Sequence, residues 1–130
     1  MMREIKFRAI HKLTKHWFEE SNIVFEDGKW FEDGRAHEDY RPMNLEQVAV
    51  MQYTGLKDKN GTEIYEGDAL GKQGYWGYYV GQKDGAYVAI PLDKVQRINW
   101  SWKNIKTCVD VGFVVIGNIY ENPELLLEGE

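Results

Sequence analysis

Turn-forming dipeptides that contain glycine divide this chain into short segments, and this punctuation limits what the chain can fold into. Asp27-Gly28, Asn60-Gly61 and Asp84-Gly85 each stand between apolar or aromatic runs. Such pairs favour tight hairpins because the central residues of these turns need positive φ. Aromatic residues, which make up 14% of the chain, also favour strands over helices. We therefore predict a mainly β protein, built as a small barrel or sandwich of short strands.

The apolar runs give the expected strands. Ile5, Phe7 and Ala9 alternate with charged residues, which is typical of a half-buried strand. Further strands are predicted over residues 16–19, 22–26, 29–32, 48–53, 63–65, 69–70, 75–80, 86–90, 97–102 and 109–120. Residues 44–47 are expected to form a single helical turn. A short C-terminal helix is expected over residues 122–125, with Asn122 as its N-cap and Pro123 at the first position.

The length of 130 residues fits one domain, and 43% apolar residues suffice for a core. A polar stretch over residues 33–44 is the best candidate for a boundary within the chain. We expect it to separate an N-terminal β-hairpin lobe, residues 1–43, from a barrel formed by residues 44–130.

Charge and cysteine content narrow the classes of protein. The net charge of −5 argues against a surface that grips nucleic acid throughout, and it disfavours binding to anionic membranes. No apolar run approaches the ~20 residues of a membrane span, and the first residues lack the apolar core of a signal peptide. With Cys108 as the single cysteine, no intramolecular disulfide can form. We expect a protein of a reducing compartment.

Four segments of the sequence carry a family resemblance. They are REIKFRA at residues 3–9, MQYTGLKDKNG at 51–61, EIYEGD at 63–68 and VIGNIYENPEL at 115–125. In this order the chain resembles the YopX family, found in phages and prophages of low-GC Gram-positive bacteria. The resemblance implies a phage or prophage origin, and with it the cytoplasm of a bacterial host cell. It also implies a mostly β protein whose C-terminal part is an SH3-like barrel. It supplies no catalytic residues.

Outside those segments, residues 14–41 and 71–110 follow no family string, so a function specific to this member is expected there. Within the segments, turn chemistry and strand period indicate a structural role. Ile64, Tyr65, Ile116, Ile119 and Tyr120 alternate or cluster as core residues would.

Catalytic and metal-binding chemistry finds little support. His11, His16 and His37 lack the spacing of a metal site. Cys108 is followed by Val109 and Val111 in a pattern that predicts a buried, inert thiol on a strand. We therefore expect no catalytic residue, no metal, no cofactor and no enzymatic activity.

The stretch Tyr75-Trp76-Gly77-Tyr78-Tyr79 is the most informative for binding. On a strand, Tyr75 and Tyr79 would point to one side and Trp76 and Tyr78 to the other. Further along the chain, residues 94–106 form a locally basic stretch in which two tryptophans would share one face of a strand. The predicted interaction surface comprises Tyr75, Trp76, Tyr78, Tyr79, Lys94, Arg97, Trp100, Trp102 and Lys103.

Core packing, a subunit interface and ligand contact all remain open for these aromatic residues. The favoured hypothesis is a non-enzymatic interaction module that contacts a host or phage protein or assembles with itself. The alternative is weak binding of single-stranded nucleic acid, where exposed rings stack on bases beside basic side chains. An enzyme of unknown class is a distant third.

Overall fold

The computed structural model describes residues 5–18, 23–26, 29–32, 43–92 and 103–127. The strands are β1 (Phe7–His11), β2 (Ile23–Glu26), β3 (Lys29–Glu32), β4 (Val48–Lys57), β5 (Glu63–Tyr65), β6 (Asp68–Gly71), β7 (Tyr78–Lys83), β8 (Ala86–Pro91), β9 (Lys103–Asn104) and β10 (Val114–Asn118). One short α-helix, α2 (Ile105–Asp110), and a 3-10 helix, η2 (Pro123–Leu127), accompany them. The protein is mainly β, as predicted.

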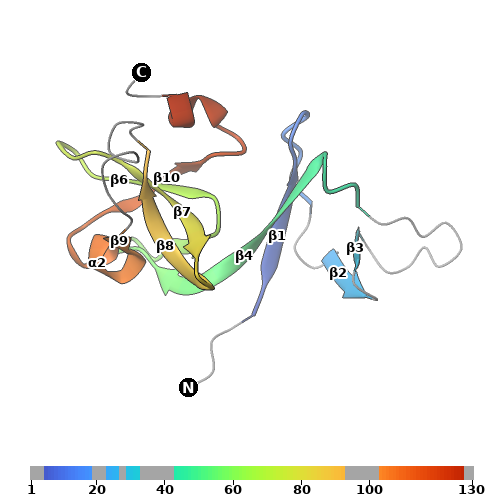
Figure 1. Ribbon diagram of the computed structural model, residues 1–130, viewed down its shortest axis with the longest axis horizontal. Coiled ribbons are helices and arrows are strands. Elements are labelled where there is room, and N and C mark those ends of the chain that lie inside the picture. Colours follow the sequence, from blue (N-terminus) through green and yellow to red (C-terminus); the bar gives the residue numbers. More distant parts are fainter. Residues whose placement is uncertain (1–4, 19–22, 27–28, 33–42, 93–102, 128–130) are drawn as a thin grey trace, which may run out of the picture.

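The strands form three antiparallel sheets. Their orders are β1-β4-β5, β10-β6-β7-β8-β9 and β2-β3. The five-stranded sheet is curled, and α2 lies at one end of it, beside β8 and β9 (Figure 1). None of these sheets closes on itself over the described residues, so the SH3-like barrel stays a prediction.

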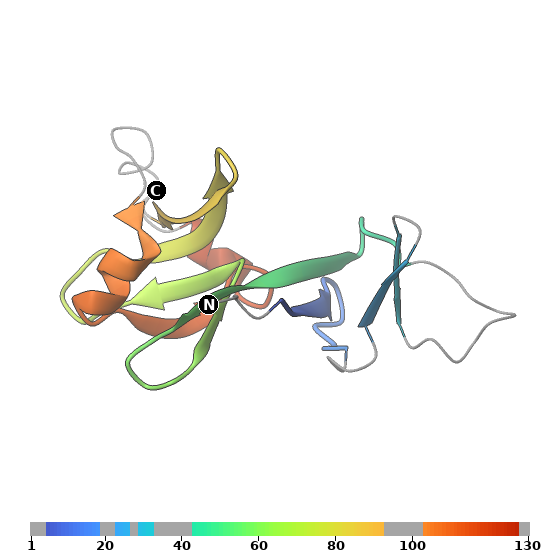
Figure 2. The ribbon, with the colours of Figure 1, turned by 90° about the horizontal axis from the view of Figure 1, so that it is seen from below.

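Strand β4 joins the two ends of the molecule. Its first half pairs with β1, from His11 opposite Val48 to Phe7 opposite Gln52. After a register shift its second half pairs with β5. Figures 1 and 2 show it running from the curled sheet towards the β2–β3 hairpin. The strand is longer than the one expected over residues 48–53 because its second half finds a partner in β5.

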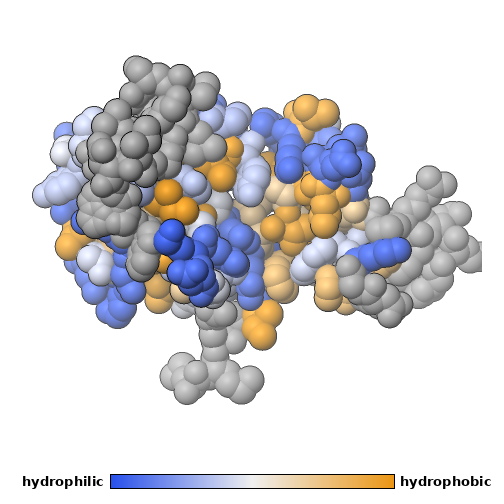
Figure 3. All heavy atoms as spheres, in the orientation of Figure 1, coloured by the Kyte–Doolittle hydropathy of each residue, from blue (hydrophilic) through white to orange (hydrophobic). Residues whose placement is uncertain are grey.

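The N-terminal hairpin is present. In it, Ile23 of β2 lies opposite Glu32 of β3, while the turn itself lies outside the described residues. The Trp30 ring contacts both Phe25 and Phe7, with centroids 4.6 and 4.7 Å apart, and so ties the hairpin to β1. On the face drawn in Figure 3, hydrophobic side chains gather over the β1–β4 ribbon.

Two turns show why glycine is needed. Asp84 and Gly85 connect β7 to β8 with φ of 53° and 84°, the signature of a type I′ hairpin turn, as the sequence predicted. Gly67 connects β5 to β6 with φ of 88°, and a Cβ there would lie 2.7 Å from Cε2 of Tyr120. Any side chain at Gly67 would therefore meet both backbone strain and a steric clash.

Buried residues form two clusters. One lies beneath the five-stranded sheet and comprises Ile64, Leu70, Val80, Ala89, Ile105, Cys108 and Phe113. The other lies between β1, β4 and β5 and comprises Ile10, Ala49, Met51, Tyr53 and Tyr65. The clusters meet at β5, whose neighbours Ile64 and Tyr65 point to opposite faces.

Two of the strand predictions are wrong in part. Strand β7 begins at Tyr78, so Tyr75 to Gly77 form a loop in which strand alternation has no meaning. Residues 109 and 110 belong to α2, which starts where the Asn104 side chain accepts a hydrogen bond from the Lys106 N–H at 2.8 Å. The β-branched valines predicted a strand. The Asn104 cap and the burial of Ile105 and Cys108, three residues apart, stabilise a helix instead.

Smaller differences concern single segments. In place of a strand over residues 16–19, the described part holds only a bridge between Trp17 and Ile10, and Glu19 lies outside it. Ile116, expected in the core, is 55% exposed because it is the unpaired residue of a bulge in β10, between Val115 and Gly117. The strand expected over residues 97–102 lies outside the described residues. The C-terminal helix is present as η2.

Candidate functional site

The predicted interaction surface is divided by the fold. Tyr75 and Trp76 are each 62% exposed in the loop before β7. Tyr78 and Tyr79 are half-buried in β7, where Tyr78 stacks edge-on against Phe113 with ring centroids 5.5 Å apart. Exposed Lys103 begins β9. The remaining predicted residues, Lys94, Arg97, Trp100 and Trp102, lie outside the described residues.

Tyr75 stands at the edge of a surface groove of about 610 Å³, here called the Tyr75 groove. Strands β6 and β10, the turn after α2, the helix η2 and several loops contribute to it. Its lining residues are Lys59, Asn60, Gly71, Lys72, Gln73, Tyr75, Gly77, Leu92, Gly112, Val114, Ile116 and Leu125. A volume of this size lies within the range of ligand-binding sites.

Two glycines leave room on the floor of the groove. A Cβ built at Gly71 would lie 2.8 Å from Cδ1 of Ile116, and one at Gly77 would lie 2.9 Å from Cδ1 of Leu92. Because glycine has no Cβ, the Ile116 and Leu92 side chains lie close against the backbone of these two residues. They give the groove an apolar floor.

The basic wall of the groove is held in place. The Lys72 ammonium donates a hydrogen bond to the Val111 carbonyl oxygen and lies 4.6 Å from the centroid of the Tyr75 ring. The Tyr75 N–H bonds the Lys72 carbonyl oxygen, and the Leu92 N–H bonds that of Gly77. These contacts fix the 72–77 loop against its surroundings.

Sequence reasoning found only the aromatic part of this groove. It interpreted Gly71 to Gly74 and Lys59-Asn60 as turns, which they are. Nothing in a linear pattern indicated that both turns border the same hollow as Ile116 and Leu125. The one available signal was the lysine that precedes the aromatic stretch by three residues.

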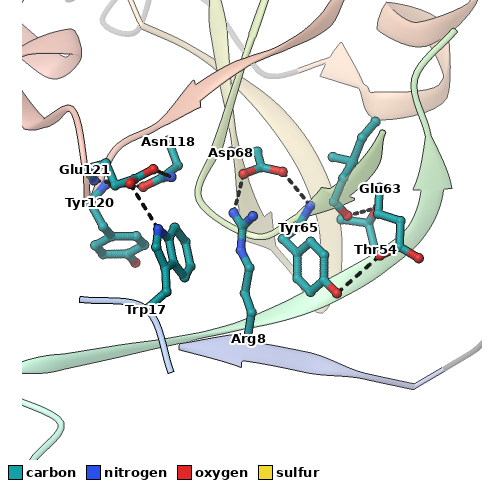
Figure 4. A network of polar contacts seen from close by, with 10 residues as sticks. Arg8, Trp17, Thr54, Glu63, Tyr65, Asp68, Asn118, Tyr120 and Glu121 are labelled. Carbon is teal, nitrogen blue, oxygen red and sulfur yellow. Dashed lines mark hydrogen bonds and ion pairs between the residues drawn. The ribbon is translucent and has the colours of Figure 1, made fainter. Parts of the chain in front are cut away.

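A second polar cluster lies where the sheets meet (Figure 4). The Arg8 guanidinium pairs with the Asp68 carboxylate and lies between two rings, 4.4 Å from the centroid of Tyr65 and 4.9 Å from that of Trp17. The other Asp68 oxygen accepts from the Tyr65 N–H at 2.8 Å. The Trp17 indole N–H donates to Glu121 at 3.0 Å.

The chemistry of this junction is structural. Asp68 is 1% exposed, and both of its oxygens are engaged within the protein. Burial raises the pKa of Asp68, against the opposing effects of the Arg8 charge and the Tyr65 N–H. With no open face at the carboxylate, the pair can fasten β1 to β6 but offers nothing for a substrate to approach.

Other reactive groups are isolated. Burial raises the pKa of the Cys108 thiol, which sits in α2, so the reactive thiolate is disfavoured. Within the described residues, no three His, Cys, Asp or Glu side chains gather as a metal site would require. His37 lies outside them.

The model of a family described as YopX protein matches residues 6–127 of the chain. The chain belongs to the YopX family. A solved structure, the crystal structure of protein EF1440 from Enterococcus faecalis, is similar to it, with a TM-score of 0.59 and 29% sequence identity. The likeness covers 96% of this chain and 99% of the other. Among curated proteins, none matches the chain significantly.

In this YopX protein the four segments that carried the resemblance meet in space. Each segment contributes to the network in Figure 4, through Arg8, Thr54, Tyr65, Asp68, Asn118 and Glu121. The Tyr75 groove is mixed. It takes Lys59, Asn60, Ile116 and Leu125 from those segments, but Lys72 and Tyr75 from the stretch that follows no family string.

No helix in the described ranges of this YopX protein is long and apolar enough to cross a membrane.

Proposed function

We propose that this YopX protein is a non-enzymatic interaction module of phage or prophage origin, which binds a segment of a host or phage protein in the Tyr75 groove. The observation that carries the proposal is an exposed aromatic ring beside a fixed ammonium, above an apolar floor. Such mixed surfaces are typical of peptide-binding sites. The described lining contains no carboxylate, histidine or thiol for acid–base or nucleophilic catalysis.

An SH3-like barrel is proposed as the frame of the groove. Ile64 of β5 packs in one buried cluster with Leu70, Val80 and Ala89 of the five-stranded sheet. This shared interior supports a barrel in which β4 and β5 complete the wall that the larger sheet begins.

Weak binding of single-stranded nucleic acid is the second candidate. Lys59 and Lys72 beside the Tyr75 ring favour it, because bases stack on rings while cations hold phosphates. Two lysines in a protein of net charge −5 make a short basic track, so a protein segment is the better fit.

Selection of peptides from a random display library against the full chain tests the proposal. Tyr75→Ala and Trp76→Ala form a matched pair, since both side chains are equally exposed but only Tyr75 lines the groove. Enriched peptides should bind Tyr75→Ala at least about fivefold more weakly, as expected for an interface hot spot, and Trp76→Ala nearly as well as the parent. Thermal melting confirms that both variants fold.

The opposite results are equally clear. Failure to enrich any peptide whose binding depends on Tyr75 would remove the proposal. Binding of an oligothymidylate that weakens steeply with salt would favour the nucleic-acid candidate. Sedimentation of the chain at several concentrations tests self-association, because a monomer at every concentration removes a homo-oligomer.

A further inference from the structure

The Tyr75 groove differs in charge from the molecule that carries it. The chain has 21 acidic and 16 basic residues, yet the groove is lined by Lys59 and Lys72 and by no described carboxylate. Among the described residues, neither ammonium has a carboxylate within ion-pair distance. The groove is therefore a local positive site on a negative protein.

Lys72 is prepared for an anionic ligand. Its ammonium carries three N–H donors, of which one is engaged by the Val111 carbonyl oxygen. The Tyr75 ring, whose centroid lies 4.6 Å from the ammonium, and the Val111 carbonyl oxygen hold the side chain in one place. Because the Lys72 side chain is already ordered, a ligand carboxylate would bind it with little further loss of conformational entropy, which favours binding.

The floor suits an apolar side chain. Val114 and Ile116 of β10 lie beside Gly71 of β6, and Leu92 and Leu125 border them. Ile116 is unusually exposed for a strand residue that the sequence placed in the core. An incoming apolar group would cover Ile116 and remove its surface from water.

We infer that the occupant of the Tyr75 groove is an extended acidic segment of a partner protein, with an apolar or aromatic residue on the floor and carboxylates at Lys59 and Lys72. The inference rests on the proposed function and names the chemistry of its partner. Charge complementarity with Lys59 and Lys72 selects the acidic segment.

A titration of the 15N-labelled full chain tests this inference by NMR. The probes are the peptide Ac-Asp-Asp-Leu-Phe-Asp-Asp-amide and two analogues in which Asn or Lys replaces every Asp. Shifts at the amides of Gly71, Gly77 and Gly112 report the groove. Peptide is added to about 2 mM, where a binding free energy of roughly −4 kcal/mol is still detected.

Lysine variants provide the matched control. Lys72→Met keeps the aliphatic stem and removes the charge, and Lys83→Met removes the same charge from an exposed site at the β7 end, outside the groove. We expect the acidic peptide to bind Lys72→Met about three- to tenfold more weakly than the parent and to bind Lys83→Met unchanged. Added salt should weaken binding to the parent more than to Lys72→Met.

The outcomes separate the inference from the proposed function. Equal or tighter groove binding by the Asn or Lys peptide would overturn the acidic segment and leave a peptide-binding module standing. Groove shifts caused by an oligothymidylate, but by none of the peptides, would overturn both. Silence of the groove amides towards every probe would also overturn both.

Discussion

The Arg8–Asp68 pair combines a fully buried carboxylate with a guanidinium that is still partly exposed. Removing one partner of such a pair is costly, because the other keeps its charge in a poorly solvated place. We expect Asp68→Asn to lower the free energy of unfolding by about 2–3 kcal/mol, measured by urea unfolding followed by tryptophan fluorescence.

A matched substitution separates burial from charge. Asp110→Asn breaks the exposed Lys106–Asp110 pair of α2 and should change the free energy of unfolding by about 0.5 kcal/mol at most. Similar losses for the two variants would show that Asp68 is not held in a buried pair.

Asp58, in the turn between β4 and β5, makes the stability of the fold depend on pH in the acidic range. Burial would raise the pKa of Asp58, but the backbone N–H groups of Val115, Thr62 and Asn60 donate to its carboxylate and together lower it. Since the folded pKa is the lower one, this carboxylate stabilises the fold above its ordinary pKa. That contribution is lost as the pH falls through the lowered pKa.

Asp58→Asn should therefore cost about 2 kcal/mol at neutral pH and flatten the loss of stability in acid, measured by urea unfolding across a pH series. Asp84→Asn, in an exposed turn, is the control and should leave the profile unchanged. An Asp58→Asn profile parallel to that of the parent would contradict the assignment.

At the scale of elements, α2 depends on one capping side chain. The Asn104 side chain accepts from the Lys106 N–H, and a helix of six residues has few other bonds to hold it. Asn104→Ala should cost about 1 kcal/mol and reduce the protection of the α2 amides in hydrogen exchange. Asn104→Asp keeps a capping oxygen and should retain both; loss of protection in it as well would refute the capping role.

The same element marks where sequence patterns stop being sufficient. Period-two alternation identified β1, and the glycine dipeptides identified the β2–β3 and β7–β8 hairpins, because these signals are local. Val109 and Tyr75 misled, since their preference for strands was overridden by a cap and by a loop fixed through Gly77 and Lys72. Of the Tyr75 groove, only the aromatic edge was predictable, because Lys59 and Ile116 reach it through strand pairing that a linear pattern does not contain.

At the scale of the whole molecule, β4 and β5 belong to both buried clusters. Met51 and Tyr53 of β4 pack with Tyr65 of β5 in one cluster, while Ile64 of β5 is buried in the other and Leu56 of β4 packs against it. The Trp17–Glu121 and Lys15–Tyr120 hydrogen bonds add links between the N-terminal segment and the chain after β10. A wall shared by two cores should make the described parts unfold as one cooperative unit.

Met51→Ala tests this coupling, because Met51 is fully buried in the cluster between β1, β4 and β5. We expect a loss of about 3 kcal/mol, and hydrogen exchange should show the same loss for protected amides of β4 and of β8, although β8 belongs to the other cluster. Leu13→Ala, at an exposed site, should change neither set by more than about 0.5 kcal/mol. If β8 amides keep their protection while those of β4 lose it, the two cores unfold separately. The stability of the Tyr75 groove would then follow that of the five-stranded sheet, because Lys59 and Asn60 alone among its described lining residues come from the β4–β5 connection.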